Sequence, residues 1–103
     1  MEIIKTVTGG ICTLRIIGGI DRFARASLRE ALSDAGTQGE VHLDLADVEL
    51  AGSVLINLLI EIRNQNPGES RKIKIVNAPE HALAILRAFR IHEFYRVNQR
   101  ERT

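Results

Sequence analysis

Strand-like and helix-like segments alternate along most of this chain. Four segments have the composition and apolar–polar alternation of β-strands: 2–8, 11–17, 40–45 and 71–76. Three segments place apolar residues at helical spacing or are apolar over successive turns: 21–36, 53–68 and 78–90. Strands that are separated by helices need crossover connections, and these favour parallel pairing. We therefore expect an α/β fold in the order β-β-α-β-α-β-α, with a mixed, mainly parallel sheet flanked by helices.

Turn residues mark the ends of these segments. Gly9 and Gly10 join the first two strands and are typical of a tight hairpin turn, so that pair should be antiparallel. Residues 66–68, which read Asn-Pro-Gly, should end the second helix. The segment 93–97 is interpreted either as a last short strand or as a packed end. Residues 98–103 are polar and are expected to form a loose tail.

Length and composition favour one small cytoplasmic domain spanning 1–103. A chain of 103 residues is the size of a single domain, and 45% apolar with 26% charged residues is ordinary for a globular protein. No apolar run reaches the ~18 residues that span a bilayer, and the first residues do not resemble a signal peptide. The single Cys12 cannot form an internal disulfide, which is consistent with a reducing compartment.

The charges are distributed unevenly. Residues 1–70 contain 6 Lys and Arg against 10 Asp and Glu, whereas residues 71–103 contain 8 against 3. The basic end has no accompanying nucleic-acid motif, so we interpret it as a solvated surface and expect no direct binding to nucleic acid. Four acids precede the second helix within a short stretch: Glu40, Asp44, Asp47 and Glu49. These acids predict a binding partner with a basic rim.

The sequence lacks the residue spacings that mark common catalytic, metal and cofactor sites. His42, His81, His92 and Cys12 do not fall at metal-ligand spacing. The sequence contains no glycine-rich phosphate loop and no nucleophilic serine elbow. We therefore expect no enzyme activity, no catalytic residue, no metal and no cofactor. Nucleotide binding is not favoured, because the sequence has no segment that would cradle a phosphate.

Three stretches together resemble the STAS domain family, which includes anti-sigma factor antagonists. "LRIIGGIDRFARASLREAL" is similar to the family's strand, turn and first helix, with Gly18 and Asp21 in matching places. "VHLDLADVELAGSVLINLL" is similar to its central strand and the loop into the second helix. "RKIKIVNAPEHALAILRAFRIHEFYRV" is similar to its last strand and helix. The resemblance covers nearly the whole chain and implies the same fold.

The resemblance also implies a function and a modified residue. In the antagonists, a serine at the start of the second helix is phosphorylated by a partner serine kinase that is itself an anti-sigma factor, and a phosphatase reverses this. Ser53 stands at that position. Gly52 stands where the family commonly has aspartate, and Val54 and Asn57 stand where it has small residues.

Each of these residues also has a purely structural interpretation. Ser53 is a favourable residue for capping a helix, and Asp21 is suited to cap the preceding one. Gly52 is suited to a sharp turn into the helix. Asn57 either bonds to a neighbouring loop within a buried helix or lies on an exposed face used for docking.

A protein-binding surface is the function that these observations favour. Parallel strands bring the loops at their C-terminal ends to one end of the sheet. The expected surface consists of Asp21, Asp47, Glu49, Gly52, Ser53, Val54 and Asn57. Its partner is expected to be an anti-sigma factor with kinase activity. The alternative is a non-phosphorylated interaction subunit that contacts the ATPase of an ABC-type transporter. The sequence leaves open whether the domain forms a homodimer.

Overall fold

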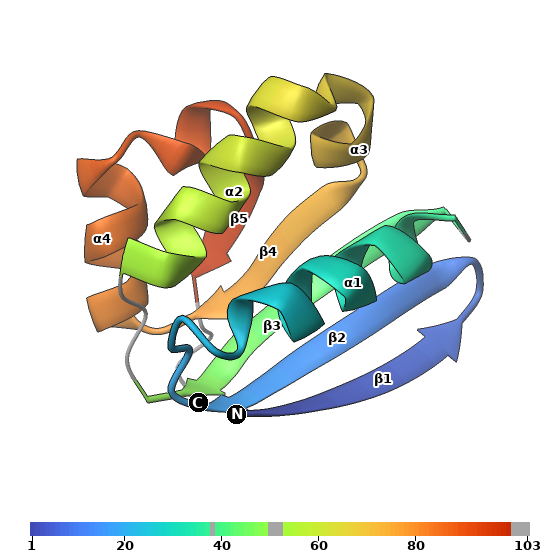
Figure 1. Ribbon diagram of the computed structural model, residues 1–103, viewed down its shortest axis with the longest axis horizontal. Helices are drawn as coiled ribbons and strands as arrows, with labels where there is room; N and C mark the ends of the chain where they lie inside the picture. The colour runs from blue at the N-terminus through green and yellow to red at the C-terminus, as the bar shows by residue number, and fades with distance from the viewer. Residues whose placement is uncertain (38, 50–52, 100–103) are drawn as a thin grey trace.

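The computed structural model describes residues 1–37, 39–49 and 53–99, which form a five-stranded sheet with helices (Figure 1). The strands are β1 Glu2–Thr8, β2 Ile11–Gly18, β3 Glu40–Val48, β4 Ile73–Ala78 and β5 Arg96–Gln99. The helices are α1 Arg25–Gly36, α2 Ser53–Gln65, α3 Pro67–Arg71 and α4 Glu80–Ala88, followed by the 3-10 helix η1 Ile91–Glu93.

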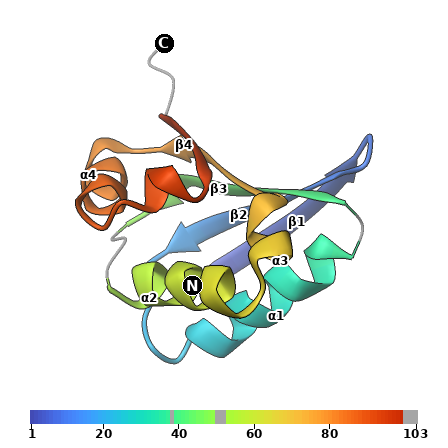
Figure 2. The ribbon, with the colours of Figure 1, turned by 90° about the horizontal axis from the view of Figure 1, so that it is seen from above.

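The strands lie in the sheet in the same order as in the chain, from β1 to β5. β1 is antiparallel to β2, and every later neighbour is parallel. Figure 2 shows α1, α2 and α3 on one side of the sheet and α4 beside its β5 edge. The opposite side, which we call the open face, is not covered by any described helix. The predicted α/β fold with a mixed, mainly parallel sheet and its order of elements is confirmed.

The core lies between the sheet and the helices α1 and α2. On the central strand β3, Val41, Leu43 and Leu45 are fully buried. Leu43 pairs with Leu14 of β2 and Ile75 of β4, so three buried side chains lie in one row across the sheet. The alternate residues of β3 point to the open face, which accounts for the period of two in the sequence.

The first two strands form the predicted hairpin. Gly9 and Gly10 have φ values of 57° and 79°, which is the conformation of a two-residue turn that only glycine adopts without strain. β1 forms the edge of the sheet and is mostly exposed, with Ile4 40% and Val7 52% exposed. Ile3 is the residue of β1 that packs, only partly buried, against the core.

The structure adds the short helices α3 and η1 to the expected elements. α2 ends at Gln65 as expected, but Pro67 then begins the short helix α3. The Asn66 side chain accepts a hydrogen bond from the Glu69 N–H at 3.1 Å and caps α3. Of the two interpretations of 93–97, the last short strand is the one that the structure contains, as β5, and this strand extends through Asn98 and Gln99, which were expected in the loose tail. Residues 100–103 lie outside the described residues.

The last long helix differs from expectation at one end. Ala82, Leu83 and Leu86 of α4 are buried. Phe89, within the predicted helix 78–90, is 55% exposed, because the helix ends at Ala88 and the chain turns there. Among the described residues, no helix is long and apolar enough to cross a membrane.

Tyr95 joins the end of the chain to the helical layer. Its side chain is 3% exposed, and its hydroxyl donates a hydrogen bond to the carbonyl oxygen of Leu59 in α2. Burial, and then the negative charge of Glu69, raise the pKa of the Tyr95 phenol well above its ordinary value. The folded protein therefore holds the neutral phenol strongly.

We expect Tyr95→Phe to lower the free energy of unfolding near neutral pH by about 1 kcal/mol, because a buried hydrogen bond to Leu59 is lost while the ring still packs. Urea denaturation followed by circular dichroism measures this change. An unchanged free energy of unfolding would show that the bond makes no net contribution.

The raised pKa predicts an alkaline loss of stability. Below about pH 10 the phenol is neutral in both states, whereas above it the unfolded chain releases the proton more readily. The contribution of the Tyr95 phenol to the free energy of unfolding is therefore complete below about pH 10 and declines as the pH rises above it. We expect stability to fall less in Tyr95→Phe than in wild type between about pH 8 and about pH 11, because lysine titration is common to both proteins. The chain has one tyrosine and no tryptophan, so tyrosinate absorbance follows this group alone.

Candidate docking surface

Two loops leave the sheet side by side at the end where the parallel strands finish. The Glu49 N–H donates to the Gly18 carbonyl at 3.0 Å, which holds the ends of β3 and β2 together. In both Figures 1 and 2, the segment between β2 and α1 lies close to the start of α2. The predicted meeting of these segments at one end of the sheet is therefore present in the fold.

The start of α2 presents polar side chains to solvent. α2 begins at Ser53, and both Ser53 and Asn57 are exposed, whereas Val54 is partly buried against the core. Residues 53, 57 and 61 are four positions apart and lie on one stripe of the helix. Asn57 therefore faces solvent, on the face that the sequence analysis had proposed for docking, and not the interior.

An ion pair fixes the position of this stripe beside α1. The Arg25 guanidinium, at the first residue of α1, contacts the Glu61 carboxylate on α2. Both side chains are about one-third exposed, so the pair is at the surface of the helix–helix contact. It aligns the beginning of α1 with the middle of α2, and Asn57 lies one helical turn before it.

Asp21 orders the loop that leads into α1. Its Oδ1 accepts hydrogen bonds from the N–H groups of Phe23 at 3.0 Å and Ala24 at 2.9 Å. Asp21 thus closes the turn that precedes α1 and does not cap the helix as predicted, because α1 begins later than expected, at Arg25, and its N-cap residue Ala24 has no side-chain cap hydrogen bond. A contact between Asp21 and a partner remains a prediction.

The four acids expected to form one patch are separated in the structure. Asp47 lies on the open face and is paired with Arg15, whose Nε is 2.5 Å from Oδ2. Glu40 is at the opposite end of β3. Glu49 is exposed, and its N–H is bonded to Gly18 at the end of β2. The acidic patch, and the basic rim it implied for a partner, are therefore not supported.

Glu40 belongs to a separate charged cluster on the open face. Its carboxylate contacts the Arg96 guanidinium and lies 3.6 Å from Nε2 of His42. The hydrogen bond from Arg96 is the main cause that lowers the pKa of the Glu40 carboxyl below its ordinary value. Asp44, next along the strand, is engaged locally through a 2.9 Å hydrogen bond from the Ala46 N–H.

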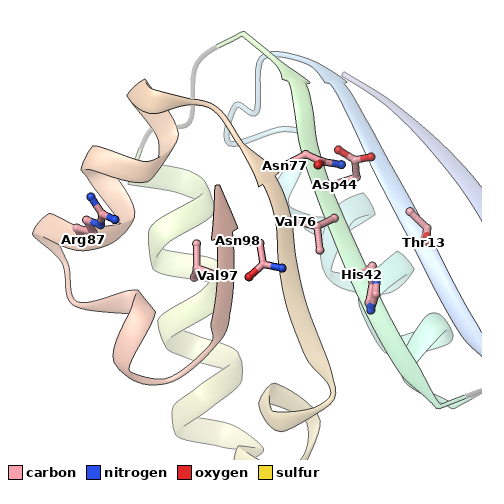
Figure 3. Close-up of a pocket in the computed structure, with 8 residues that line it drawn as sticks. All are labelled: Thr13, His42, Asp44, Val76, Asn77, Arg87, Val97 and Asn98. Atoms are coloured by element: carbon pink, nitrogen blue, oxygen red, sulfur yellow. The ribbon is translucent and has the colours of Figure 1, made fainter. Parts of the chain in front are cut away.

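A polar depression of about 710 Å³ lies on the same open face (Figure 3). It is lined by Thr13, His42, Asp44, Val76, Asn77, Arg87, Val97 and Asn98. Asn77 has a left-handed backbone, with φ of 56°, where β4 becomes irregular. Within the described part of the chain, no three His, Cys, Asp or Glu side chains are grouped so that they could hold a metal ion. None of the predicted docking residues lines this depression.

Sequence and structure comparisons define the family. A family model described as "Mlab, STAS domain" matches residues 5–97. The chain therefore belongs to the STAS domain family. No protein with a curated description shows significant sequence similarity to it.

Solved structures with the same fold include several anti-sigma factor antagonists. One from Mycobacterium paratuberculosis superposes with a TM-score of 0.79 at 16% identity, covering 94% of this chain and 84% of its own. The antagonist SpoIIAA in its unphosphorylated form gives 0.73 at 11% identity, covering 93% and 87%. A Thermotoga maritima protein assigned to the same class gives 0.71 at 15% identity, covering 94% and 86%. At these identities the likeness shows the fold.

The predicted site residues are thus only partly brought together. Asp21, Glu49, Ser53 and Asn57 lie at one end of the domain, whereas Asp47 is directed to the open face. Gly52 lies outside the described residues. Sequence reasoning missed the ion pair of Arg25 with Glu61, because nothing in the pattern of a single sequence joins two charges 36 positions apart.

We expect Asp21→Ala to lower the free energy of unfolding by about 1 kcal/mol, because two N–H groups lose their acceptor. Asp21→Asn keeps an acceptor oxygen and should lose less than half as much. Urea unfolding of both variants measures the difference. Equal losses in the two variants would show that the charge of Asp21, and not its hydrogen bonds to the two N–H groups, stabilises the loop.

Proposed function

We propose that this STAS domain is a regulatory protein-binding domain of the anti-sigma factor antagonist type. Its partner is an anti-sigma factor that also acts as a serine kinase, in the cytoplasm, and a phosphatase restores the unmodified form. The observation that carries the proposal is the exposed Ser53 hydroxyl at the first residue of α2, on the same stripe as the exposed Asn57. Asp21, Glu49, Gly52 and Val54 complete the proposed contact.

Phosphorylation of Ser53 is compatible with the fold. A phosphate there adds about −1.5 to −2 charges at neutral pH. The first N–H groups of a helix have no partner within the helix, and the helix dipole favours an anion at this end. Asp47 is already paired with Arg15, and Glu49 is the acid that precedes Ser53 most closely in the sequence. The domain tolerates the charge, whereas a docked partner is displaced by it.

A second function is favoured by a specific residue. Gly52 occupies the position where the family's phosphorylated members commonly carry aspartate. In this alternative the same surface binds the ATPase subunit of an ABC-type transporter and Ser53 is never modified. Neither function requires nucleic-acid binding or membrane insertion, and a homodimer is compatible with both.

The test is affinity capture from a lysate of the source organism with wild type, Ser53→Ala and Ser53→Asp as baits, followed by mass spectrometry. Ser27→Asp is the matched control, because it adds the same charge at an exposed serine of α1. We expect wild type, Ser53→Ala and Ser27→Asp to retain an anti-sigma factor and Ser53→Asp to lose it, because the added charge disrupts the docked face.

The remaining outcomes discriminate between the functions. A transporter ATPase that is retained equally by all four baits would establish the second function and make Ser53 a structural residue. Capture of neither protein by wild type would contradict both functions. Phosphorylation of purified wild type and Ser53→Ala to the same extent by the captured kinase would show that Ser53 is not the acceptor.

A further inference from the structure

An aromatic side chain projects into solvent beside the proposed contact. Phe23 is 78% exposed, more than any other large apolar residue among those described. It lies in the loop between β2 and α1, the segment that runs close to the start of α2. Phe89 and Phe94 are also exposed, but they belong to the chain that follows α4.

The backbone that carries Phe23 is held firmly. The N–H of Phe23 itself donates to Asp21 Oδ1, and the next N–H does the same. Two residues later, Arg25 is anchored to α2 through Glu61. Because the backbone is already ordered, only the side-chain torsions of Phe23 lose freedom when the ring enters a pocket.

A positively charged side chain lies against the Phe23 ring. The Arg22 guanidinium lies 4.9 Å from the centre of the Phe23 ring. Within the described part of the chain Arg22 forms no ion pair, whereas Arg25 is paired and the Asp21 carboxylate is engaged by the two loop N–H groups. A complementary partner therefore presents an apolar cavity for the ring and a carboxylate near its edge.

We propose that Phe23 is the apolar anchor of the docking surface and that it enters a pocket with an acidic rim on the partner anti-sigma factor, where Arg22 meets the rim. This rests on the function proposed above and assigns the chemistry of its partner. Exposed aromatic residues dominate the binding energy of many interfaces, particularly when a desolvated pocket surrounds them.

The experiment measures binding of the purified anti-sigma factor to wild type, Phe23→Ala, Phe23→Leu and Phe89→Ala by surface plasmon resonance. We expect Phe23→Ala to raise Kd at least about 10-fold, mainly through faster dissociation, and Phe23→Leu to raise it less. Phe89→Ala, which removes an exposed ring elsewhere, should stay within about 2-fold. Thermal unfolding controls for the fold, and the Phe23 variants should match wild type because the ring is solvated.

The charge is tested separately with Arg22→Glu. We expect this variant to associate more slowly than wild type, and the difference to shrink as salt is raised, because steering between exposed charges is screened. If wild type and Phe23→Ala bind the anti-sigma factor equally well, Phe23 is not the anchor of the docking surface, whereas the proposed function stands. If Arg22→Glu associates faster, the rim is basic and the assigned chemistry is overturned. If wild type binds no anti-sigma factor, the proposed function is contradicted, and the role proposed for Phe23 is contradicted with it.

Discussion

Strands β2, β3 and β4 direct their fully buried apolar side chains to one side of the sheet, and the positions of the other elements follow from this. The row formed by Leu14, Leu43 and Ile75 must be covered, and right-handed crossovers bring α1 and α2 to that side. The same parallel crossovers collect the loops after β2 and β3 at one end. The docking surface is therefore located where two obligatory connections meet, and its residues contribute little to the core.

Much of this arrangement could be predicted because it follows from local rules. The Gly9–Gly10 turn, the alternation along β3 and the apolar helices each have a signal within a few residues. Ser53 could be assigned to the start of a helix for the same reason, whereas Asp21, predicted as a cap, orders the turn before α1 instead. The short helix α3 and the last strand β5 were harder to predict, because the same residues are compatible with more than one local structure. Pro67 both stops α2 and begins α3, and β5 is a strand because β4 offers it hydrogen bonds.

The surface itself was harder to predict, because charge and exposure depend on contacts between distant segments. Proximity along the chain suggested one acidic patch, but strand geometry separates Glu40 from Glu49, and Arg15 neutralises Asp47. Phe23 was assigned to the first predicted helix, but α1 begins at Arg25, so the ring belongs to the loop before it and is exposed. The position of a helix boundary depends on contacts that a single sequence does not show.

The marginal burial of β1 has a consequence for the dynamics of the domain. This edge strand is attached through its ladder with β2 and the glycine turn, and Ile3 is its main contact with the core. Separation of β1 from β2 therefore exposes little apolar area, so it costs much less free energy than opening β3 or β4. Amide hydrogens of β1 should exchange with solvent through this local opening, long before those of the central strands. β3, the strand after which the second docking segment leaves the sheet, is the central strand and should exchange more slowly than β1.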